Sequence, residues 1–252
     1  MVLPNKLTKA EKKAARAQKK NCNVSTGLDL KNINPLTVNQ SNAFADFDYG
    51  YNLFLYGYAG TGKSFIGLYL ALDEVLEANS KYNKVVIVRS VVPTRDMGFL
   101  PGNSKEKSKE YEAPYVEICS ELFGRGDAYG ILKQKGVLDF ITTSFVRGIT
   151  LRNCIVIVDE IQNMTKEELN SIITRVGENC KIIFCGDVRQ CDLKAYRETS
   201  GISDFIQIIH SMKSFSFIEF QIEDIVRGPI VKEYIIARYR LEDEGKIRPI
   251  HV

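Results

Sequence analysis

Residues 57–64 combine glycines, a lysine and a serine at the spacing G-x-x-x-x-G-K-[ST], which suits a loop that holds a polyphosphate. Glycines let such a loop wrap closely around phosphates with its N–H groups pointing inward, and a helix that starts there adds a favourable dipole. Lys63 would reach the β- and γ-phosphates, and the Ser64 hydroxyl would coordinate Mg²⁺. The alternative, a glycine-rich turn formed by coincidence, is disfavoured by the apolar run before the loop and the helical pattern after it. We therefore expect a site for ATP and Mg²⁺ with contacts from Gly57, Tyr58, Ala59, Gly60, Thr61, Gly62, Lys63, Ser64 and Phe65.

Two consecutive carboxylates, Asp159 and Glu160, follow an apolar run at residues 155–158. Such a run is typical of a buried strand, and in open α/β sheets the carboxyl ends of the strands face the ligand. Asp159 would hold Mg²⁺ directly or through water, and Glu160 would act as general base on the attacking water. The alternative is an ordinary strand end with solvated acids. The pair argues against a small-molecule kinase, because the acceptor of such an enzyme is a substrate hydroxyl rather than water.

Three further side chains are candidates for nucleotide contacts, each with an ordinary surface residue as the alternative. Gln190 follows the apolar run 182–185, and its amide could contact the γ-phosphate or orient water. Gln40 lies upstream of the glycine-rich loop, where an amide could read the adenine edge with a paired donor and acceptor. Arg227 precedes the last helical pattern, and an arginine at the γ-phosphate accelerates hydrolysis by roughly 10³–10⁵. The expected catalytic residues are thus Glu160, Lys63, Gln190 and Arg227.

The elements that must position these residues are short β-rich runs that alternate with helical patterns from residue 50 onward. Several runs are apolar at consecutive positions, as expected for strands that a parallel sheet buries on both faces. Strand–helix alternation implies right-handed crossovers and a doubly wound sheet. We expect strands at 52–56, 84–89, 138–142, 154–159, 181–186 and 216–220, and helices at about 63–79, 110–122, 165–177, 200–212 and 229–243. The polar, lysine-rich segment 102–112 is expected to form a mobile loop.

Length and composition place the chain among ordinary globular proteins. It has 252 residues, of which 44% are hydrophobic and 26% charged, which excludes disordered, collagen-like and disulfide-rich classes. Residues 1–20 hold seven Lys or Arg and one Glu, whereas the remaining 232 hold 27 basic and 30 acidic residues. We expect a basic arm and linker over 1–32, serving either solubility or contact with phosphates or a neighbouring subunit. A single ATPase domain is expected over 33–252.

The cysteines and the N-terminus indicate a cytosolic protein. None of the six cysteines forms a C-x-x-C pair, and the histidines His210 and His251 are far from any cysteine cluster, so a zinc site is not expected. The N-terminus has charge but no apolar stretch, which argues against a signal peptide. No run of about 18 apolar residues occurs, so we expect no membrane span.

Together, these motifs resemble the PhoH-like ATPases, phosphate-starvation-inducible proteins with a RecA-like core similar to one motor domain of superfamily-one helicases. The resemblance covers about residues 33–240. Besides the loop at 57–64, it rests on Asp159-Glu160-Ile161-Gln162-Asn163, Gly186-Asp187-x-x-Gln190, GFLPG at 98–102 with Lys107 and Pro114-Tyr115, FVRGITL at 145–151, SGI at 200–202 and DIVR at 224–227. Gly228 replaces the family's usual histidine. No fused RNase domain is expected, and the chain looks like a compact viral or phage version.

The resemblance implies a RecA-like P-loop NTPase fold, with a doubly wound, mostly parallel sheet and helices on both faces. It assigns nucleotide roles to Lys63, Ser64, Asp159, Glu160 and Gln190, and it supports Arg227. It also suggests that Gln162 links the nucleotide site to a nucleic-acid surface.

Two classes of function then compete. The first is an Mg²⁺-dependent ATPase that binds single-stranded nucleic acid, preferably RNA, and acts as a helicase or translocase. Because the chain has room for one motor domain, Arg227 would act from a neighbouring subunit, which implies a homo-oligomeric ring such as a hexamer.

The second class is a nucleotide-controlled switch with slow hydrolysis and no motor activity, which the net charge of −3 outside the arm favours. A local basic groove could still form within a neutral total, from Lys105, Lys107, Lys109, Arg147 and Arg152. Arg89 and Arg147, at the ends of expected strands, could contact a phosphate backbone or a neighbouring nucleotide. A third hypothesis, a phosphotransferase, is disfavoured because Glu160 would activate water rather than a substrate hydroxyl.

Overall fold

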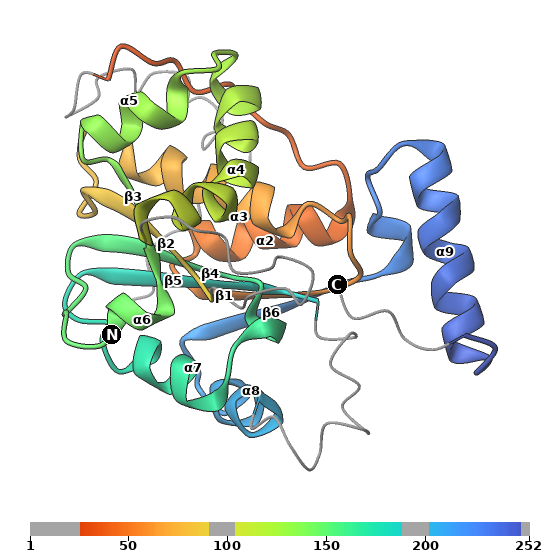
Figure 1. The fold of residues 1–252 in the computed structure, drawn as a ribbon. Coiled ribbons are helices and arrows are strands. Elements are labelled where there is room, and N and C mark those ends of the chain that lie inside the picture. Colours follow the sequence, from red (N-terminus) through yellow and green to blue (C-terminus); the bar gives the residue numbers. More distant parts are fainter. Residues whose placement is uncertain (1–25, 91–103, 188–201, 248–252) are drawn as a thin grey trace, which may run out of the picture.

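The computed structural model describes residues 26–90, 104–187 and 202–247, which form one sheet with helices around it (Figure 1). The sheet has six strands in the order β3-β2-β4-β5-β1-β6, and all neighbouring strands run parallel. The strands are β1 (Asn52–Gly57), β2 (Lys84–Arg89), β3 (Leu138–Thr142), β4 (Cys154–Asp159), β5 (Cys180–Gly186) and β6 (Phe215–Phe220). The expected doubly wound α/β sheet of the RecA-like P-loop class is therefore confirmed.

The apolar runs are buried on both sides, because successive residues of each strand enter two different cores. In β1, Leu53 and Leu55 pack into the core on one face, whereas Phe54 packs into the core on the other. The six residues of β4 are all buried. Continuous apolar stretches are what a parallel sheet covered on both faces requires, which explains why the strands could be recognised in the sequence.

Helices cover both faces of the sheet (Figure 1). One layer of helices packs against the core that contains Leu53 and Leu55, and the other packs against the core that contains Phe54. The first layer contains α2 (Val38–Asp48), α3 (Lys63–Val75), α4 (Ser104–Phe123) and α5 (Ala128–Gln134). The second contains α6 (Thr143–Val146), α7 (Lys166–Ile173) and α8 (Ile202–His210). The last helix, α9 (Pro229–Asp243), stands apart from both layers.

The expected boundaries match well for the strands and less well for the helices. β2, β3 and β4 begin and end at the expected residues. The expected loop at 102–112 is wrong from Ser104 onward, because α4 starts there and includes Pro114. The segment is polar, but its lysines and glutamates are strong helix formers, so polarity was a poor guide to its conformation. Helices α2, α5 and α6 were not predicted.

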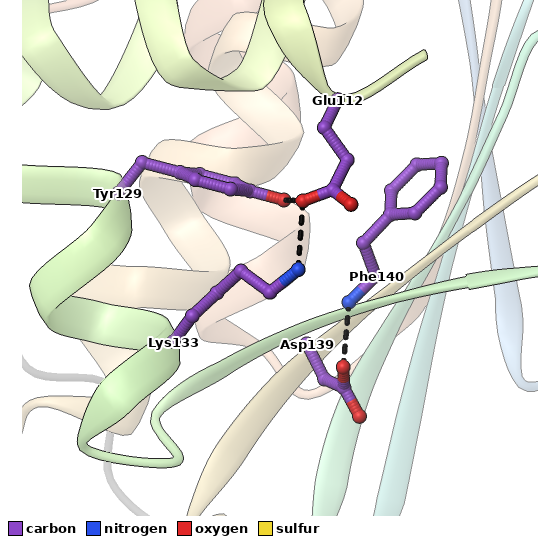
Figure 2. A network of polar contacts seen from close by, with 5 residues as sticks. All are labelled: Glu112, Tyr129, Lys133, Asp139 and Phe140. Carbon is purple, nitrogen blue, oxygen red and sulfur yellow. Dashed lines mark hydrogen bonds and ion pairs between the residues drawn. The ribbon is translucent and has the colours of Figure 1, made fainter. Parts of the chain in front are cut away.

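A polar clamp fixes α4 against α5 (Figure 2). The carboxylate of Glu112, on α4, accepts hydrogen bonds from the Tyr129 hydroxyl at 2.5 Å and from the Lys133 ammonium at 2.7 Å, both on α5. Burial and the neighbouring Glu112 raise the pKa of Tyr129, so its hydroxyl remains a donor. The clamp lies one helical turn from Tyr115, and it therefore helps to orient the residue that α4 contributes to the site described below.

The remaining sequence expectations concern cysteines, membrane spans and the N-terminal arm. Cys119, Cys154, Cys180 and Cys185 are free thiols. Within the described ranges, none of the helices is both long and apolar enough to cross a membrane. The basic arm at residues 1–20, Cys22, Cys191 and His251 lie outside the described residues.

Candidate nucleotide-binding site

The loop at residues 57–64 joins β1 to α3 and depends on a glycine at its first position. Gly57 has φ of +118°, and a Cβ there would lie 2.1 Å from the carbonyl oxygen of Phe220 on β6. The backbone of β6 thus presses directly on the start of the loop, and a side chain would force the two apart. Gly62 caps α3 without a side-chain acceptor, so the first N–H groups of this helix stay available to an anion.

Lys63 lies at the centre of the loop with 9% of its surface exposed. Its ammonium donates hydrogen bonds to the carbonyl oxygens of Tyr58, at 2.6 Å, and Gly57, at 3.0 Å. Burial lowers the pKa of Lys63, and the nearby carboxylate of Asp187 is the strongest of the charges that oppose this effect. The loop therefore encloses a buried ammonium group. Phosphate oxygens could replace the two carbonyl oxygens as acceptors of its hydrogen bonds.

The carboxylate of Asp159, at the end of β4, is held from two sides. Its Oδ1 accepts a hydrogen bond of 2.7 Å from the Ser64 hydroxyl, and its Oδ2 accepts one of 2.7 Å from the Tyr115 hydroxyl. Tyr115 is 1% exposed, and burial followed by the charge of Asp159 raises its pKa. The contact between Ser64 and Asp159 brings a hydroxyl and a carboxylate oxygen together beside the loop.

These two oxygen donors suit Mg²⁺, which proteins often bind through one or two carboxylates together with substrate phosphates. Over the described ranges, no cluster of three or more His, Cys, Asp or Glu side chains could hold a metal ion by itself. The donor set at Ser64 and Asp159 fits a magnesium ion whose other ligands come from a triphosphate and water.

Glu160 follows in a left-handed backbone conformation, with φ of +55°. Few residues other than glycine adopt this conformation, and it is often found where a side chain must be aimed at a reaction centre. Burial, followed by the charge of Asp159, raises the pKa of Glu160, whereas Arg89 and the hydrogen bond from Gln162 act in the opposite direction. A carboxylate with a raised pKa suits the role of general base.

Gln162 connects the ends of β4 and β5. Its amide nitrogen donates to Glu160, and its Oε1 accepts a hydrogen bond of 3.0 Å from the backbone N–H of Asp187. Gly186 allows this approach, since a Cβ there would lie 2.4 Å from Cγ1 of Ile161. The structure thus brings Lys63, Asp159, Glu160 and Asp187 together at the carboxyl edge of the sheet.

Gln40, on α2, lies beside the loop and has both amide atoms occupied. Its Oε1 accepts a hydrogen bond of 2.7 Å from the backbone N–H of Leu36, and its Nε2 donates one of 3.1 Å to the carbonyl oxygen of Thr61. The side chain is 4% exposed. Gln40 therefore links the loop to the residues that precede α2. A contact between Gln40 and the adenine edge stays a prediction.

Arg227 lies against the loop of its own chain. A Cβ on Gly60 would lie 2.9 Å from Cγ of Arg227, and the neighbouring Val226 donates its N–H to the carbonyl oxygen of Gly60 at 3.1 Å. The residue itself is exposed. Arg227 is thus near the loop of its own chain, whereas the room for a single motor domain led us to expect that it acts from a neighbouring subunit.

Several expected residues fall outside the described part of the chain or apart from the site. Gln190 and the stretch 98–102 are not among the described residues, and neither are the side chains of Lys105 and Lys107. Arg152 precedes β4 at the amino edge of the sheet, opposite to the edge where Lys63 and Glu160 lie. Arg152 thus lies apart from the nucleotide site, and the basic groove expected from it together with Lys105, Lys107, Lys109 and Arg147 stays a prediction.

Three residues of the site had no role assigned from the sequence. Tyr115 and Asp187 lie inside motifs that the resemblance singled out, so a signal for them existed. Tyr239, which donates a hydrogen bond of 2.8 Å to Oδ2 of Asp187, had no such signal.

Comparisons with known proteins agree with this geometry. The family model described as PhoH-like protein matches residues 32–239. A PhoH-like protein of Synechocystis sp. is 32% identical over 197 residues, which cover 78% of this chain and 59% of that protein. One of Bacillus subtilis is 31% identical, covering 82% and 64%, and Protein PhoH of Escherichia coli K12 is 30% identical, covering 73% and 52%. The chain thus spans roughly half to two thirds of the length of these relatives.

Solved structures show more distant likenesses. The UvsW helicase from bacteriophage T4 is 15% identical with a TM-score of 0.46, and the match covers 84% of this chain and 68% of that one. The large terminase from a thermophilic bacteriophage is 12% identical with a TM-score of 0.46, covering 82% and 50%. The family assignment depends on the match over residues 32–239 and on the relatives at about 30% identity. These matches show that the chain belongs to the PhoH-like protein family.

Proposed function

We propose that the chain is an Mg²⁺-dependent ATPase that couples hydrolysis to the binding of single-stranded nucleic acid, with RNA as the preferred strand. The observation that carries this proposal is the meeting of Lys63, the Ser64–Asp159 pair and Glu160 at one sheet edge, beside the start of α3, where Gly62 offers no side-chain cap to the helix N–H groups. Phosphoryl transfer to water requires a cation for the phosphates, a hydroxyl and a carboxylate that bind the metal, and a general base.

The residues divide the work as follows. The loop N–H groups and Lys63 bind the β- and γ-phosphates. Ser64 and Asp159 would hold Mg²⁺, which would neutralise phosphate charge. Glu160 takes a proton from water as the water oxygen attacks the γ-phosphorus and the bond to the β–γ bridging oxygen breaks. Gln190 contacts the γ-phosphate, and Gln40 lies at the adenine end.

Arg227 stabilises charge on the transferred phosphoryl group, and its packing against Gly60 supports action within its own chain. Replacing Arg227 with alanine should abolish hydrolysis while sparing ATP binding, which equilibrium titration with a fluorescent ATP analogue measures. Equal loss of both would count against this role. A homo-oligomeric ring such as a hexamer is tested separately by the mass of the native assembly.

The coupling to nucleic acid is tested by ATP turnover with and without single-stranded RNA or DNA across a salt series. We expect stimulation that weakens as salt rises, because phosphate contacts release counterions. Lys63→Ala serves as the inactive control. Turnover that neither strand changes would favour the second candidate, a nucleotide-controlled switch, which the net negative charge outside the arm supports.

A further inference from the structure

Two buried tyrosines on different helices each donate a hydrogen bond to a carboxylate at a strand end. Tyr115, on α4, donates to Asp159 after β4, and Tyr239, on α9, donates to Asp187 after β5. The two carboxylates differ in their second oxygen. That of Asp159 accepts from Ser64, whereas Oδ1 of Asp187 has no hydrogen-bond partner among the described residues. Since Asp187 is only 5% exposed, an unmet acceptor there is costly unless a ligand satisfies it.

Asp187 belongs to the polar cluster of the nucleotide site. Its charge is the strongest of those that keep the pKa of Lys63 from falling further. Its backbone N–H is bound by Gln162, which also donates to Glu160. The unmet oxygen thus lies in the region of Lys63 and Glu160, where the γ-phosphate would be.

Tyr239 packs against the loop at residues 57–64, and its hydroxyl also contacts the backbone of Ala59 in that loop. Its ring packs edge-on against Tyr58 of the phosphate loop, with 4.7 Å between ring centroids. Tyr239 and Ile235 are the buried residues of α9, and Ile235 lies beside Gly60 of the same loop. Burial and the charge of Asp187 raise the pKa of Tyr239 to about 12, so the hydroxyl keeps its proton and remains a donor.

We propose that Asp187 is a further residue of the hydrolytic site and that Tyr239 positions it. The Tyr239 hydroxyl binds Oδ2 and leaves Oδ1 to accept a hydrogen bond from the attacking water. An attacking water has two hydrogens, and its lone pair must face the γ-phosphorus. Glu160 accepts the hydrogen that is transferred, and Asp187 accepts the hydrogen that stays, so the water is fixed at two points. This inference rests on the proposed ATPase activity.

The test uses Tyr239→Phe, which removes the hydroxyl and keeps the ring contact with Tyr58. We expect kcat for ATP to fall about tenfold with KM changed less than about twofold, because a hydrogen bond to a charged group is lost and nucleotide contacts remain. The matched control is Tyr234→Phe, on the same helix but 61% exposed, which should behave as the wild type. Thermal unfolding of both variants should stay close to that of the wild type.

A double-mutant comparison separates positioning from a purely structural role. Asp187→Asn should lower kcat about a hundredfold. Asp187→Asn with Tyr239→Phe should be no slower than Asp187→Asn alone, because Tyr239 is proposed to act through the carboxylate and not through its backbone contact with Ala59 of the loop. Wild-type turnover in Tyr239→Phe, or losses that multiply in the double variant, would overturn the proposal. Absence of ATP turnover in the wild type would instead overturn the proposed function.

Discussion

Two lysines are buried at opposite edges of the sheet, and their surroundings differ. Lys63, at the carboxyl edge, is 9% exposed and lies among the carboxylates of Asp187, Glu160 and Asp159. Lys181, at the amino edge, is 6% exposed, donates a hydrogen bond of 2.8 Å to the carbonyl oxygen of Phe47, and lies 3.7 Å from the centre of the Phe47 ring. Burial lowers the pKa of both.

The difference shows that burial of a cation does not by itself mark a functional site. The ammonium of Lys181 donates to a carbonyl oxygen in the last turn of α2, a common contact at the carboxyl end of a helix. The Phe47 ring lies beside the same ammonium. Lys63 is bound to carbonyls of a glycine-rich loop and is surrounded by acids from the ends of other strands. The carboxylates around Lys63 give that edge its chemistry, and each prediction below tests whether function is confined to it.

The largest effect is expected for Glu160→Gln. The amide keeps the shape of the side chain but cannot accept a proton, so ATP turnover should fall by roughly 10²–10⁴. ATP affinity should be retained, since Lys63 and the loop are unchanged. Steady-state turnover and binding of a fluorescent ATP analogue measure the two quantities, with the exposed Glu167→Gln as control. A variant that still hydrolyses ATP at the wild-type rate would remove Glu160 from the mechanism.

A smaller effect is expected for Lys63→Met, which should weaken ATP binding by roughly tenfold to a hundredfold as charged hydrogen bonds to phosphate are lost. Lys181→Met is the matched control, because it removes an equally buried ammonium from the opposite edge. Calorimetric titration of both variants with ATP sharpens the comparison. Equal weakening in the two would show that the loss comes from general destabilisation and not from a phosphate contact.

The smallest effect concerns the pH dependence of stability. Burial lowers the pKa of Lys181 from 10.5 to about 8, so between these values the unfolded chain binds more protons than the folded chain. Folding free energy should therefore become more favourable as pH rises through this window, by less than ~1.4 kcal/mol per pH unit. Urea unfolding of the wild type and Lys181→Met across this pH window should give a difference that grows with pH. Parallel curves would contradict the assignment.

Much of the fold could be predicted because the strands are local patterns. β2, β3 and β4 are β-rich runs whose ends are marked by polar residues, and the structure places them at the expected residues. Helix α2 was missed although Thr37 caps it and Gln40 follows three residues later, because its apolar residues Phe44 and Phe47 are few. The polar start of α4 was missed for the same reason, since a run of polar residues shows no apolar periodicity.

The site could be predicted only where it is continuous in the chain. The loop at 57–64 and the Asp159–Glu160 pair are short motifs. The contacts of Tyr115 with Asp159 and of Tyr239 with Asp187 join residues 44 and 52 positions apart, and only the folded sheet brings them together. The occupied amide of Gln40 could not be foreseen either, because its partners Leu36 and Thr61 are backbone groups.

The order of the strands has a consequence for how the protein is made. β1 lies between β5 and β6, so both of its neighbours belong to the second half of the chain. At ribosomal speeds of about 5–20 residues per second, β1 waits on the order of ten seconds for a partner strand. During synthesis β1, which leads into the candidate phosphate-binding loop, therefore emerges before the other five strands but is paired only once β5 has followed, and its apolar residues stay open to aggregation during that interval.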